Sequence, residues 1–311
     1  MKVLLIGGGG FVGTHLQDAL RSRDHEVTVA DLPALAEKNP GIEPVDLERP
    51  DTLEALFSKC RPDRVFLLAA VSSVAYSWKN PDLTVRVNVL GAMNVLSALQ
   101  RHAPGARLIY IGSGEEYGVN CSEEHPFTED GPCLPINPYA VTKFAAGRML
   151  ELLTAKSGTD FVHLRPFNHF GPGQRTGFVF ADFCHDIVEI ERGLRPPVLR
   201  VGNLEAKRDF LFVDDVIDAY VRIAEAASLP RTVYNLSTGS AHSIREMLDI
   251  LIGLSNVAMK VEIDPAKFRP QDIPVLVASG ERAYRDFDWR PQNSLVEALT
   301  KTLNWWREKR D

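Results

Sequence analysis

Short apolar runs alternate with amphipathic segments along the first half of the chain. Runs rich in Val, Ile and Leu predict six strands, at residues 2–6, 26–30, 42–45, 64–69, 107–112 and 160–165. The spacing of apolar residues predicts helices between them, over residues 11–21 and 51–60 among others. Strands that alternate with helices indicate βαβ units, and therefore a parallel sheet covered on both faces.

Two further helices are predicted to begin at the pair Asn-Pro, at residues 80–81 and 137–138. Asn is favoured as the cap of a helix and Pro at its first position. In the first of these helices, intervals of four and three place one apolar stripe on Val85, Val89, Ala92, Leu96 and Leu99. This stripe is interpreted either as a face that packs on the parent sheet or as part of a contact between two copies of the chain.

The alternation ends after residue 165. Residues 166–210 are rich in Gly, Pro and Arg, which is more typical of a ligand site or a lobe than of a sheet layer. Further on, the pattern predicts a helix at 214–227, a strand at 232–236, a helix at 243–254 and a packing helix at the tail. We therefore expect an α/β protein in which residues 1–165, with returning segments at about 210–238, form a doubly wound parallel sheet. Residues 166–209 and 239–311 are expected to form a smaller, discontinuous C-terminal substrate-binding lobe.

Composition excludes several classes of function. The 311 residues include 35 Lys and Arg against 41 Asp and Glu, a net charge of −6, which argues against a nucleic-acid surface. Apolar runs stay short of the roughly 20 residues needed to span a bilayer, and glycines follow the N-terminus too early for a signal peptide. Four scattered cysteines and the spacing of the histidines favour neither a disulfide framework nor a metal site. A cytoplasmic globular protein is expected, with no metal and no nucleic-acid or membrane partner.

A glycine-rich turn follows the first strand. Gly7, Gly10 and Gly13 form Gly-x-x-Gly-x-x-Gly, a pattern that permits a tight turn and a close approach of the backbone to a pyrophosphate. The helix that starts there presents its N-terminus to the phosphates, so a Rossmann-type dinucleotide site is predicted. Asp31 follows the second strand, where a carboxylate binds the ribose hydroxyls and repels a 2′-phosphate. NAD(H) is therefore favoured over NADP(H); a solvated turn aspartate is the alternative.

Three polar side chains of the central region suggest proton exchange near neutral pH. Tyr139 and Lys143 are four residues apart, so they share one helical face, where an ammonium would lower the pKa of the phenol. Ser113 ends the fifth strand, at the carboxyl edge where open sheets bind ligands. A Tyr and a Lys at this spacing are usually a surface coincidence. Together with the glycine turn and Ser113, in this order, they are much more specific.

With these motifs the sequence resembles the extended short-chain dehydrogenase/reductases of the nucleotide-sugar branch. The matching segments of the first half are GGGGFVG at 7–13, LAA at 68–70, IGSGEEYG at 111–118 and the Tyr139/Lys143 pair. Segments 165–174, 177–179, 201–210, 268–272 and 287–291 resemble enzymes acting on GDP-mannose-derived sugars. The motifs GPGQ and GFV, and the short length, resemble the reductases of this group more than its longer 4,6-dehydratases.

The resemblance implies roles for the matching positions. Ser113 would hydrogen-bond the sugar carbonyl, Tyr139 would donate the proton, and Lys143 would bind the nicotinamide ribose. Implied cofactor contacts are Gly7, Gly10, Phe11, Val12, Gly13, Asp31, Asp46, Leu47, Leu68, Ala69, Ala70, Asn88, Tyr139, Lys143 and Pro166. Implied contacts of the GDP-linked sugar are Ser73, Trp78, Asn168, Val179, Arg208, Arg269 and Asp272. Two guanidiniums suit a pyrophosphate, because Arg offers bidentate donors.

Several of these positions have a second interpretation. Asp46 could cap the following helix, Trp78 could belong to the core or its rim, and each Arg could form a surface ion pair. Glu115 occupies the position at which related dehydratases carry the base that removes the proton α to the ketone. In a reductase it would be a bystander or a ligand of a sugar hydroxyl.

The expected function is reduction of the C4 keto group of GDP-4-dehydro-6-deoxy-D-mannose by NAD(P)H, which gives GDP-D-rhamnose. The alternatives are a GDP-mannose 4,6-dehydratase, another nucleotide-sugar epimerase or dehydratase, and a non-catalytic nucleotide sensor. Family members usually pair the helices that start here at Pro81 and Pro138, so a homodimer is expected.

Overall fold

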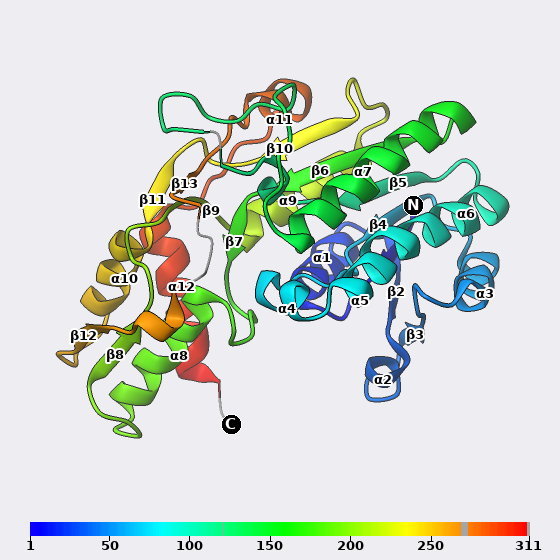
Figure 1. Ribbon diagram of the computed structural model, residues 1–311. Helices are drawn as coiled ribbons and strands as arrows, with labels where there is room; N and C mark the ends of the chain where they lie inside the picture. Colours follow the sequence, from blue (N-terminus) through cyan, green and yellow to red (C-terminus); the bar gives the residue numbers. More distant parts are fainter. Residues whose placement is uncertain (120, 269–272, 310–311) are drawn as a thin grey trace.

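A seven-stranded parallel sheet forms the centre of the computed structural model, which describes residues 1–119, 121–268 and 273–309 (Figure 1). From one edge to the other, its strands are β10 (Val233–Leu236), β6 (Phe161–Pro166), β5 (Arg107–Ile111), β4 (Arg64–Leu67), β1 (Lys2–Ile6), β2 (Glu26–Asp31) and β3 (Ile42–Pro44). All six neighbouring pairs are parallel. The predicted α/β class and doubly wound parallel sheet are therefore confirmed.

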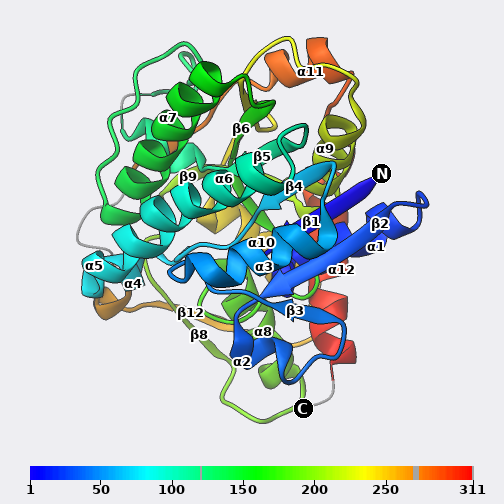
Figure 2. The same cartoon turned by 90° about the vertical axis from the view of Figure 1, so that its right-hand side faces the viewer.

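Both faces of this sheet are covered, because alternate residues of each strand enter different cores. Val3 and Leu5 belong to the core shared with α1 (Phe11–Arg21) and α9 (Val213–Glu225). Leu4 and Ile6 belong to the core on the other face. The helices of that second face are α3 (Pro50–Cys60), α6 (Gly91–His102) and α7 (Pro138–Ser157), which lie together in Figure 2. Two short helices, α2 (Pro33–Ala36) and α11 (Glu281–Phe287), complete this part.

The order of strands places the ends of β1 and β4 at a reversal of the winding. From β1 the chain proceeds outward through β2 and β3, and then returns to β4 on the other side of β1. A parallel sheet leaves a crevice at such a point, beyond the carboxyl ends of its strands. The predicted bounds of β1 and α1 are confirmed to the residue, and those of the other predicted strands of this sheet to within two residues.

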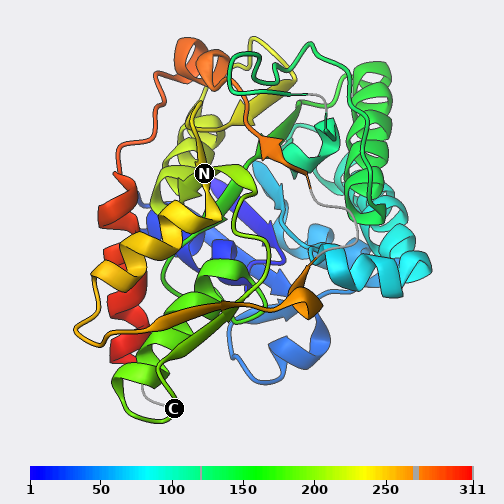
Figure 3. The same cartoon turned by 60° about the vertical axis from the view of Figure 1, so that its left-hand side comes forward.

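The remaining elements form smaller sheets beside the central one (Figure 3). One contains β7 (Asn168–Phe170), β9 (Lys207–Phe212), β11 (Ala241–Ser243) and β13 (Val275–Leu276), and the other pairs β8 (Val198–Val201) with β12 (Lys260–Ile263). The helical elements here are α8 (Val179–Glu191), α10 (Ile244–Gly253), α12 (Leu295–Glu308) and the 3₁₀ turn η3 (Pro265–Lys267). The strand pattern of residues 166–210 was not visible in the sequence, because β7 and β8 have only three and four residues.

Of the two Asn-Pro pairs, one forms a helix cap as predicted. The Asn137 side chain accepts the N–H of Ala140 at 2.9 Å at the start of α7. In the other pair, Asn80 stands at the N-cap position of α5 (Pro81–Val85) and Pro81 at its start, as predicted. The Asn80 side chain makes no cap bond, because it donates to the Tyr76 carbonyl at 3.3 Å, at the end of α4 (Val74–Lys79).

The apolar stripe of the first of these helices is interrupted. A π turn, η1 (Arg86–Leu90), joins α5 to α6 and adds a residue to the helical period. Ala92, Leu96 and Leu99 are consequently buried, whereas Val85 is 46% exposed. The stripe thus packs on the core from Val89 in the π turn onwards, and Val85 before it is left exposed.

Candidate active site

The glycine turn between β1 and α1 has the shape needed for a phosphate group. Gly7 has φ +83°, and a Cβ there would lie 2.4 Å from the Ala69 nitrogen. A Cβ on Gly13 would lie 2.3 Å from the Gly8 carbonyl oxygen. Only glycine therefore allows this close packing of turn, helix and strand, and α1 begins after Gly10 with Phe11 and Val12. The N-terminus of α1 faces the edge where a dinucleotide pyrophosphate fits.

Asp31 lies beside this turn, as predicted. One carboxylate oxygen, Oδ2, accepts the N–H of Gly9 at 3.0 Å, and Oδ1 accepts the N–H of Leu32 at 2.8 Å. Phe11 is oriented by His169, whose ring stacks on it at a centroid distance of 6.3 Å. The ring of Phe11 therefore connects α1 with the segment that follows β6, whose last residue is Pro166.

Asp46 and Leu47 follow β3. The Asp46 carboxylate accepts the N–H of Glu48 at 2.9 Å, so it stabilises the turn before α3, while Arg49 occupies the cap position. Leu47 is buried against α6, where a Cβ on Gly91 would meet its side chain at 2.7 Å. Asp46 thus has a local structural contact, although it does not cap the helix itself.

The loop after β4 carries Leu68, Ala69, Ala70 and Ser73. The Leu68 and Ala69 N–H groups both donate to the Ile6 carbonyl at 2.9 Å, which continues the β4–β1 pairing. Asn88 from the π turn binds the Val71 N–H at 2.8 Å and the Thr142 hydroxyl at 3.0 Å, and it is buried. Its amide therefore holds the loop that carries Ala69 and Ala70.

Ser73 ends this loop as the N-cap of α4, and Trp78 lies within α4. The Ser73 hydroxyl caps this helix by accepting the Tyr76 N–H at 3.2 Å. The Trp78 side chain is 55% exposed, so the interpretation as a core residue is wrong.

Ser113, Tyr139 and Lys143 come together at the carboxyl end of β5. Ser113 caps the 3₁₀ turn η2 (Gly114–Tyr117), and its hydroxyl accepts the Glu115 N–H at 3.2 Å. The same serine side chain lies close enough to Tyr139 to affect the pKa of its phenol. Lys143, one helical turn further along α7, is buried and donates to the Ile111 carbonyl at 2.7 Å.

The pKa of Tyr139 is shifted in the direction opposite to the one that the sequence predicted. Burial raises the pKa of Tyr139 above its usual value, and the nearby Ser113 side chain opposes this only in part. The expected lowering by Lys143 is wrong for this structure, since the ammonium is directed to the Ile111 carbonyl. Burial lowers the pKa of Lys143 to about 8, while the negative charge of Glu116 opposes the change. The phenol therefore stays protonated at neutral pH and can act as a proton donor.

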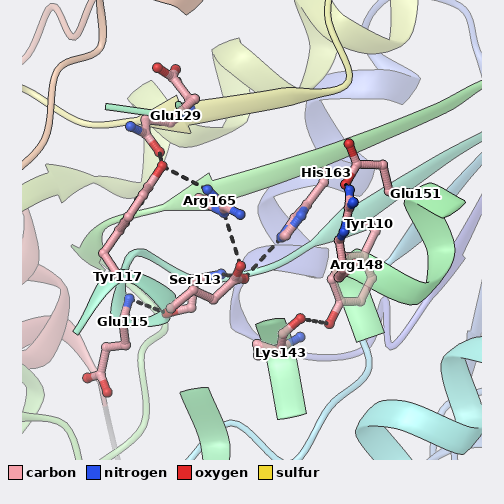
Figure 4. A network of polar contacts seen from close by, with 12 residues as sticks. Tyr110, Ser113, Glu115, Tyr117, Glu129, Lys143, Arg148, Glu151, His163 and Arg165 are labelled. Atoms are coloured by element: carbon pink, nitrogen blue, oxygen red, sulfur yellow. Dashed lines mark hydrogen bonds and ion pairs between the residues drawn. The ribbon is translucent and has the colours of Figure 1, made fainter. Parts of the chain in front are cut away.

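Glu115 is anchored next to the trio. Its Oε2 accepts a hydrogen bond from the Asn137 amide at 2.7 Å, at the start of α7. Figure 4 shows its side chain pointing away from Arg165 and His163.

The other expected substrate contacts within the described residues lie on β7, β9 and the start of α8. Asn168 is exposed on β7, and Val179 is 37% exposed at the start of α8. Arg208 on β9 is buried, and its Nη1 donates to the carbonyls of Lys207 and Ile273. Arg269 and Asp272 lie outside the described residues.

Sequence reasoning missed a buried charged network beside Ser113. Glu116 is in contact with His163 and Arg165, and Arg165 donates to the Tyr117 hydroxyl at 2.9 Å (Figure 4). A signal was present: His163 and Arg165 are the charged or ionisable residues, two apart, of a strand that is otherwise apolar and buried. Residues two apart share one face of a strand.

Two features are absent from residues 1–119, 121–268 and 273–309, the part of the chain that the structure describes. In these ranges, no three His, Cys, Asp or Glu side chains gather in a way that could hold a metal ion. In the same ranges, each helix is too short or too polar to cross a membrane.

Comparison with known proteins supports one family. Residues 4–302 match the family described as GDP-mannose 4,6 dehydratase. The chain is 32% identical to GDP-6-deoxy-D-mannose reductase of Pseudomonas aeruginosa, over 99% of this chain and 98% of that protein.

Solved structures agree with this match. RMD from Pseudomonas aeruginosa complexed with NADPH has a TM-score of 0.87 at 32% identity, over 98% of both chains. UDP-glucose 4-epimerase of Thermus thermophilus in complex with NAD has a TM-score of 0.89 at 30% identity, over 99% of both chains. The chain therefore belongs to the extended short-chain dehydrogenase/reductase family of nucleotide-sugar epimerases and dehydratases, and it is an NAD(P)-dependent enzyme that modifies nucleotide sugars.

Proposed function

We propose that this enzyme reduces the C4 keto group of GDP-4-dehydro-6-deoxy-D-mannose to give GDP-D-rhamnose. The observation that carries the proposal is the placement of the Ser113 hydroxyl beside a protonated Tyr139, with Lys143 one turn further along α7. Such a pair donates a hydrogen bond and a proton to a carbonyl oxygen as it becomes an alkoxide. Likeness to a reductase over nearly the whole chain supports the same reaction.

Each of the three residues has a distinct task in this mechanism. The nicotinamide cofactor, when bound, supplies the hydride to the carbonyl carbon. Ser113 hydrogen-bonds the carbonyl oxygen, and its cap on η2 fixes where the hydroxyl lies. Tyr139 gives up its proton to that oxygen, and the raised pKa keeps it in the acid form until then. Lys143 is charged below about pH 8 and is assigned to the nicotinamide ribose.

The proposed cofactor is NADH. Asp31 places a carboxylate at the end of β2, within 3.0 Å of the glycine turn. A 2′-phosphate at that point would meet this negative charge, whereas two ribose hydroxyls would find acceptors. The relative complexed with NADPH makes the preference worth measuring directly.

The GDP-linked sugar is assigned to a lobe formed by residues 166–209 and 239–311, and the cofactor to residues 1–165 with about 210–238. The substrate contacts we assign are Ser73, Trp78, Asn168, Val179, Arg208, Arg269 and Asp272. Arg208 supports this assignment because it is a buried guanidinium on β9, the strand between β11 and β13. Guanidiniums bind phosphate oxygens through paired donors.

A homodimer is the proposed assembly. Exposed apolar side chains lie on α5, the π turn and α7, namely Val85, Leu90, Val141, Met149, Leu152 and Leu153. Apolar side chains gathered on neighbouring helices are a common signature of a protein contact. A second copy of the chain would bury them.

The second candidate function is dehydration of GDP-mannose. Glu115 favours it, because a carboxylate two residues after the serine could remove the proton α to a C4 ketone. The bond from Asn137 to Glu115 favours the reductase instead, since it engages one carboxylate oxygen at the start of α7. A nucleotide sensor without catalysis is disfavoured because Ser113, Tyr139 and Lys143 are all present.

One pair of assays separates the candidates. The protein is incubated with NADH and GDP-4-dehydro-6-deoxy-D-mannose, and the product is identified by mass spectrometry and NMR. A reductase oxidises one NADH per sugar and yields GDP-D-rhamnose, and the Glu115→Gln variant retains this activity. Water loss from GDP-mannose alone, abolished by Glu115→Gln, would establish the dehydratase instead. Absence of both reactions would leave another nucleotide-sugar epimerase or dehydratase, or the nucleotide sensor.

A further inference from the structure

Glu116 is a fully buried carboxylate that contacts three groups next to Ser113. Its Oε1 accepts the backbone N–H of Ser113 at 2.9 Å and lies 3.0 Å from Nε2 of His163. Its Oε2 accepts Nε–H of Arg165 at 3.0 Å. Burying a carboxylate is costly unless it is paired and hydrogen-bonded, and here both oxygens are engaged. The carboxylate thus ties the cap of η2 to strand β6.

The fold leaves space for this cluster at two glycines. A Cβ on Gly112 would lie 2.2 Å from Nε2 of His163 and 2.3 Å from Oε1 of Glu116. A Cβ on Gly147, from α7, would lie 2.3 Å from Cε1 of His163. Any larger residue at either position would displace the pair. The contact between Glu116 and His163 is therefore built into β5, α7 and β6 together.

The cluster continues to Lys143 through Tyr110. The His163 ring packs against the Tyr110 ring at a centroid distance of 5.2 Å. Tyr110 donates its hydroxyl hydrogen to the Lys143 carbonyl at 3.2 Å, and the Lys143 ammonium lies 5.1 Å from the Tyr110 centroid. Figure 4 shows Tyr110 between His163 and Lys143.

The ionisable groups around Glu116 and Lys143 come from four elements. They are Tyr110 on β5, Glu116 on η2, Tyr139 on α7, and His163 and Arg165 on β6. Among them, Glu116 provides the negative charge that favours the ammonium form, against the effect of burial. Its own pKa is raised by burial, but the charges and hydrogen bonds of His163 and Arg165 bring it below its usual value. Glu116 therefore carries its charge throughout the neutral range.

Resting on the proposed function, we propose that Glu116 is a positioning residue of this active site. It holds the Ser113 backbone in the conformation that aims its hydroxyl, and its charge keeps the buried Lys143 in the ammonium form. Arg165 and His163 hold Glu116 in turn. Arg165 also binds Tyr117, whose hydroxyl donates to the Asn235 side chain at 2.7 Å. One carboxylate thus acts on two of the three residues assigned to the chemistry.

The test replaces Glu116 by Gln, which keeps the shape and removes the charge. Gln has one accepting atom, so one of the three donors around it must lose its partner. Hydrogen–deuterium exchange of the peptide spanning residues 113–117 is expected to be about tenfold faster, since a charge-assisted bond to the Ser113 N–H is weakened. From the pKa of Lys143, the alkaline limb of kcat is expected near pH 8 in the wild type. In Glu116→Gln it is expected to move about one pH unit lower, because an opposite charge near Lys143 has been removed.

Two control variants separate this role from general stability. Glu129→Gln removes another buried carboxylate, which accepts the Asn235 N–H at 2.9 Å and so belongs to the same network without contacting Ser113. It should leave both the exchange of 113–117 and the alkaline limb unchanged. Glu116→Asp keeps the charge, so its alkaline limb should stay near that of the wild type even where kcat falls. If Glu116→Gln does not fold, the position of the alkaline limb of kcat in Glu116→Asp tests the role of the charge.

The outcomes also separate this proposal from the proposed function. The exchange measurement needs only the protein, so it tests the contact between Glu116 and Ser113 even if GDP-4-dehydro-6-deoxy-D-mannose is not reduced. Unchanged exchange in Glu116→Gln would overturn the positioning role. An alkaline limb that stays in place in Glu116→Gln, or moves in Glu116→Asp, would overturn the role of the charge. Absence of turnover by the wild type, with faster exchange in Glu116→Gln, would reject the substrate and retain the contact.

Discussion

Burial of the Lys143 ammonium lowers the stability of the folded protein, and this free-energy cost can be measured. Burial lowers its pKa from the usual 10.5 to about 8. Each pKa unit corresponds to about 1.36 kcal/mol, so keeping the ammonium inside the folded protein costs about 3 kcal/mol. The change we consider is Lys143→Met, which retains a long side chain and removes the ionisable group.

The sign of the pH dependence follows from the depressed pKa of Lys143. Above pH 10.5 the lysine is neutral in both the folded and the unfolded chain, and below about pH 8 it is charged in both. Between these values the unfolded chain binds the extra proton, so the folded protein gains stability as pH rises. The free energy of unfolding of the wild type, relative to Lys143→Met, should therefore rise by about 3 kcal/mol from pH 8 to pH 10.5.

Urea unfolding at a series of pH values from 7 to 10.5 provides the assay. The variant also loses the hydrogen bond to the Ile111 carbonyl, but a neutral lysine makes that bond too, so its loss is the same at each pH. Titration of other groups is common to both proteins and cancels in the difference. Equal slopes m in wild type and variant would show that the unfolded states are comparable. A difference in stability that stays flat across this range would refute the assignment of a charged, poorly solvated Lys143.

Three other predictions concern catalysis, cofactor and assembly. Tyr139→Phe should fold and bind cofactor but lose turnover by about 10²–10⁴-fold, because it removes the general acid; steady-state kinetics with turnover near the wild-type value would exclude Tyr139 from the mechanism. Wild-type kcat/KM should be higher with NADH than with NADPH, and Asp31→Ala should narrow the gap; equal values in the wild type would contradict the role of Asp31. Light scattering at micromolar protein should give twice the 34.5 kDa of one chain, and Leu152→Glu should shift it toward one chain. A single chain in the wild type would count against the dimer.

The sequence by itself determined the central sheet and the cofactor turn. Strand β1, the glycine turn and helix α1 are adjacent in the chain, so apolar period and glycine spacing define them locally. The cap on α7 was equally readable, because an Asn and the N–H three residues later are close by the geometry of any helix. The sequence also predicted that Ser113 lies at the end of β5 and that Tyr139 and Lys143 share one helical face.

Other features depended on contacts between segments that are distant in the chain. The Asn80 side chain makes no cap bond to α5, because α4 ends there and the amide donates to the Tyr76 carbonyl. The π turn exposes Val85, which a regular helical period had assigned to one stripe. The pKa of Tyr139 rises because helix packing removes water from it, and helical spacing carries no information about burial.

The surroundings of Ser113 are the clearest case of what only the tertiary structure decided. Glu116 contacts His163 and Arg165, which are 47 and 49 positions further along the chain. In sequence Glu116 is one of two adjacent glutamates, and only the packing of η2 on β6 distinguishes it from Glu115. A buried carboxylate is stable only where opposite charges and donors surround it, and those partners are assembled when β5 and β6 pair.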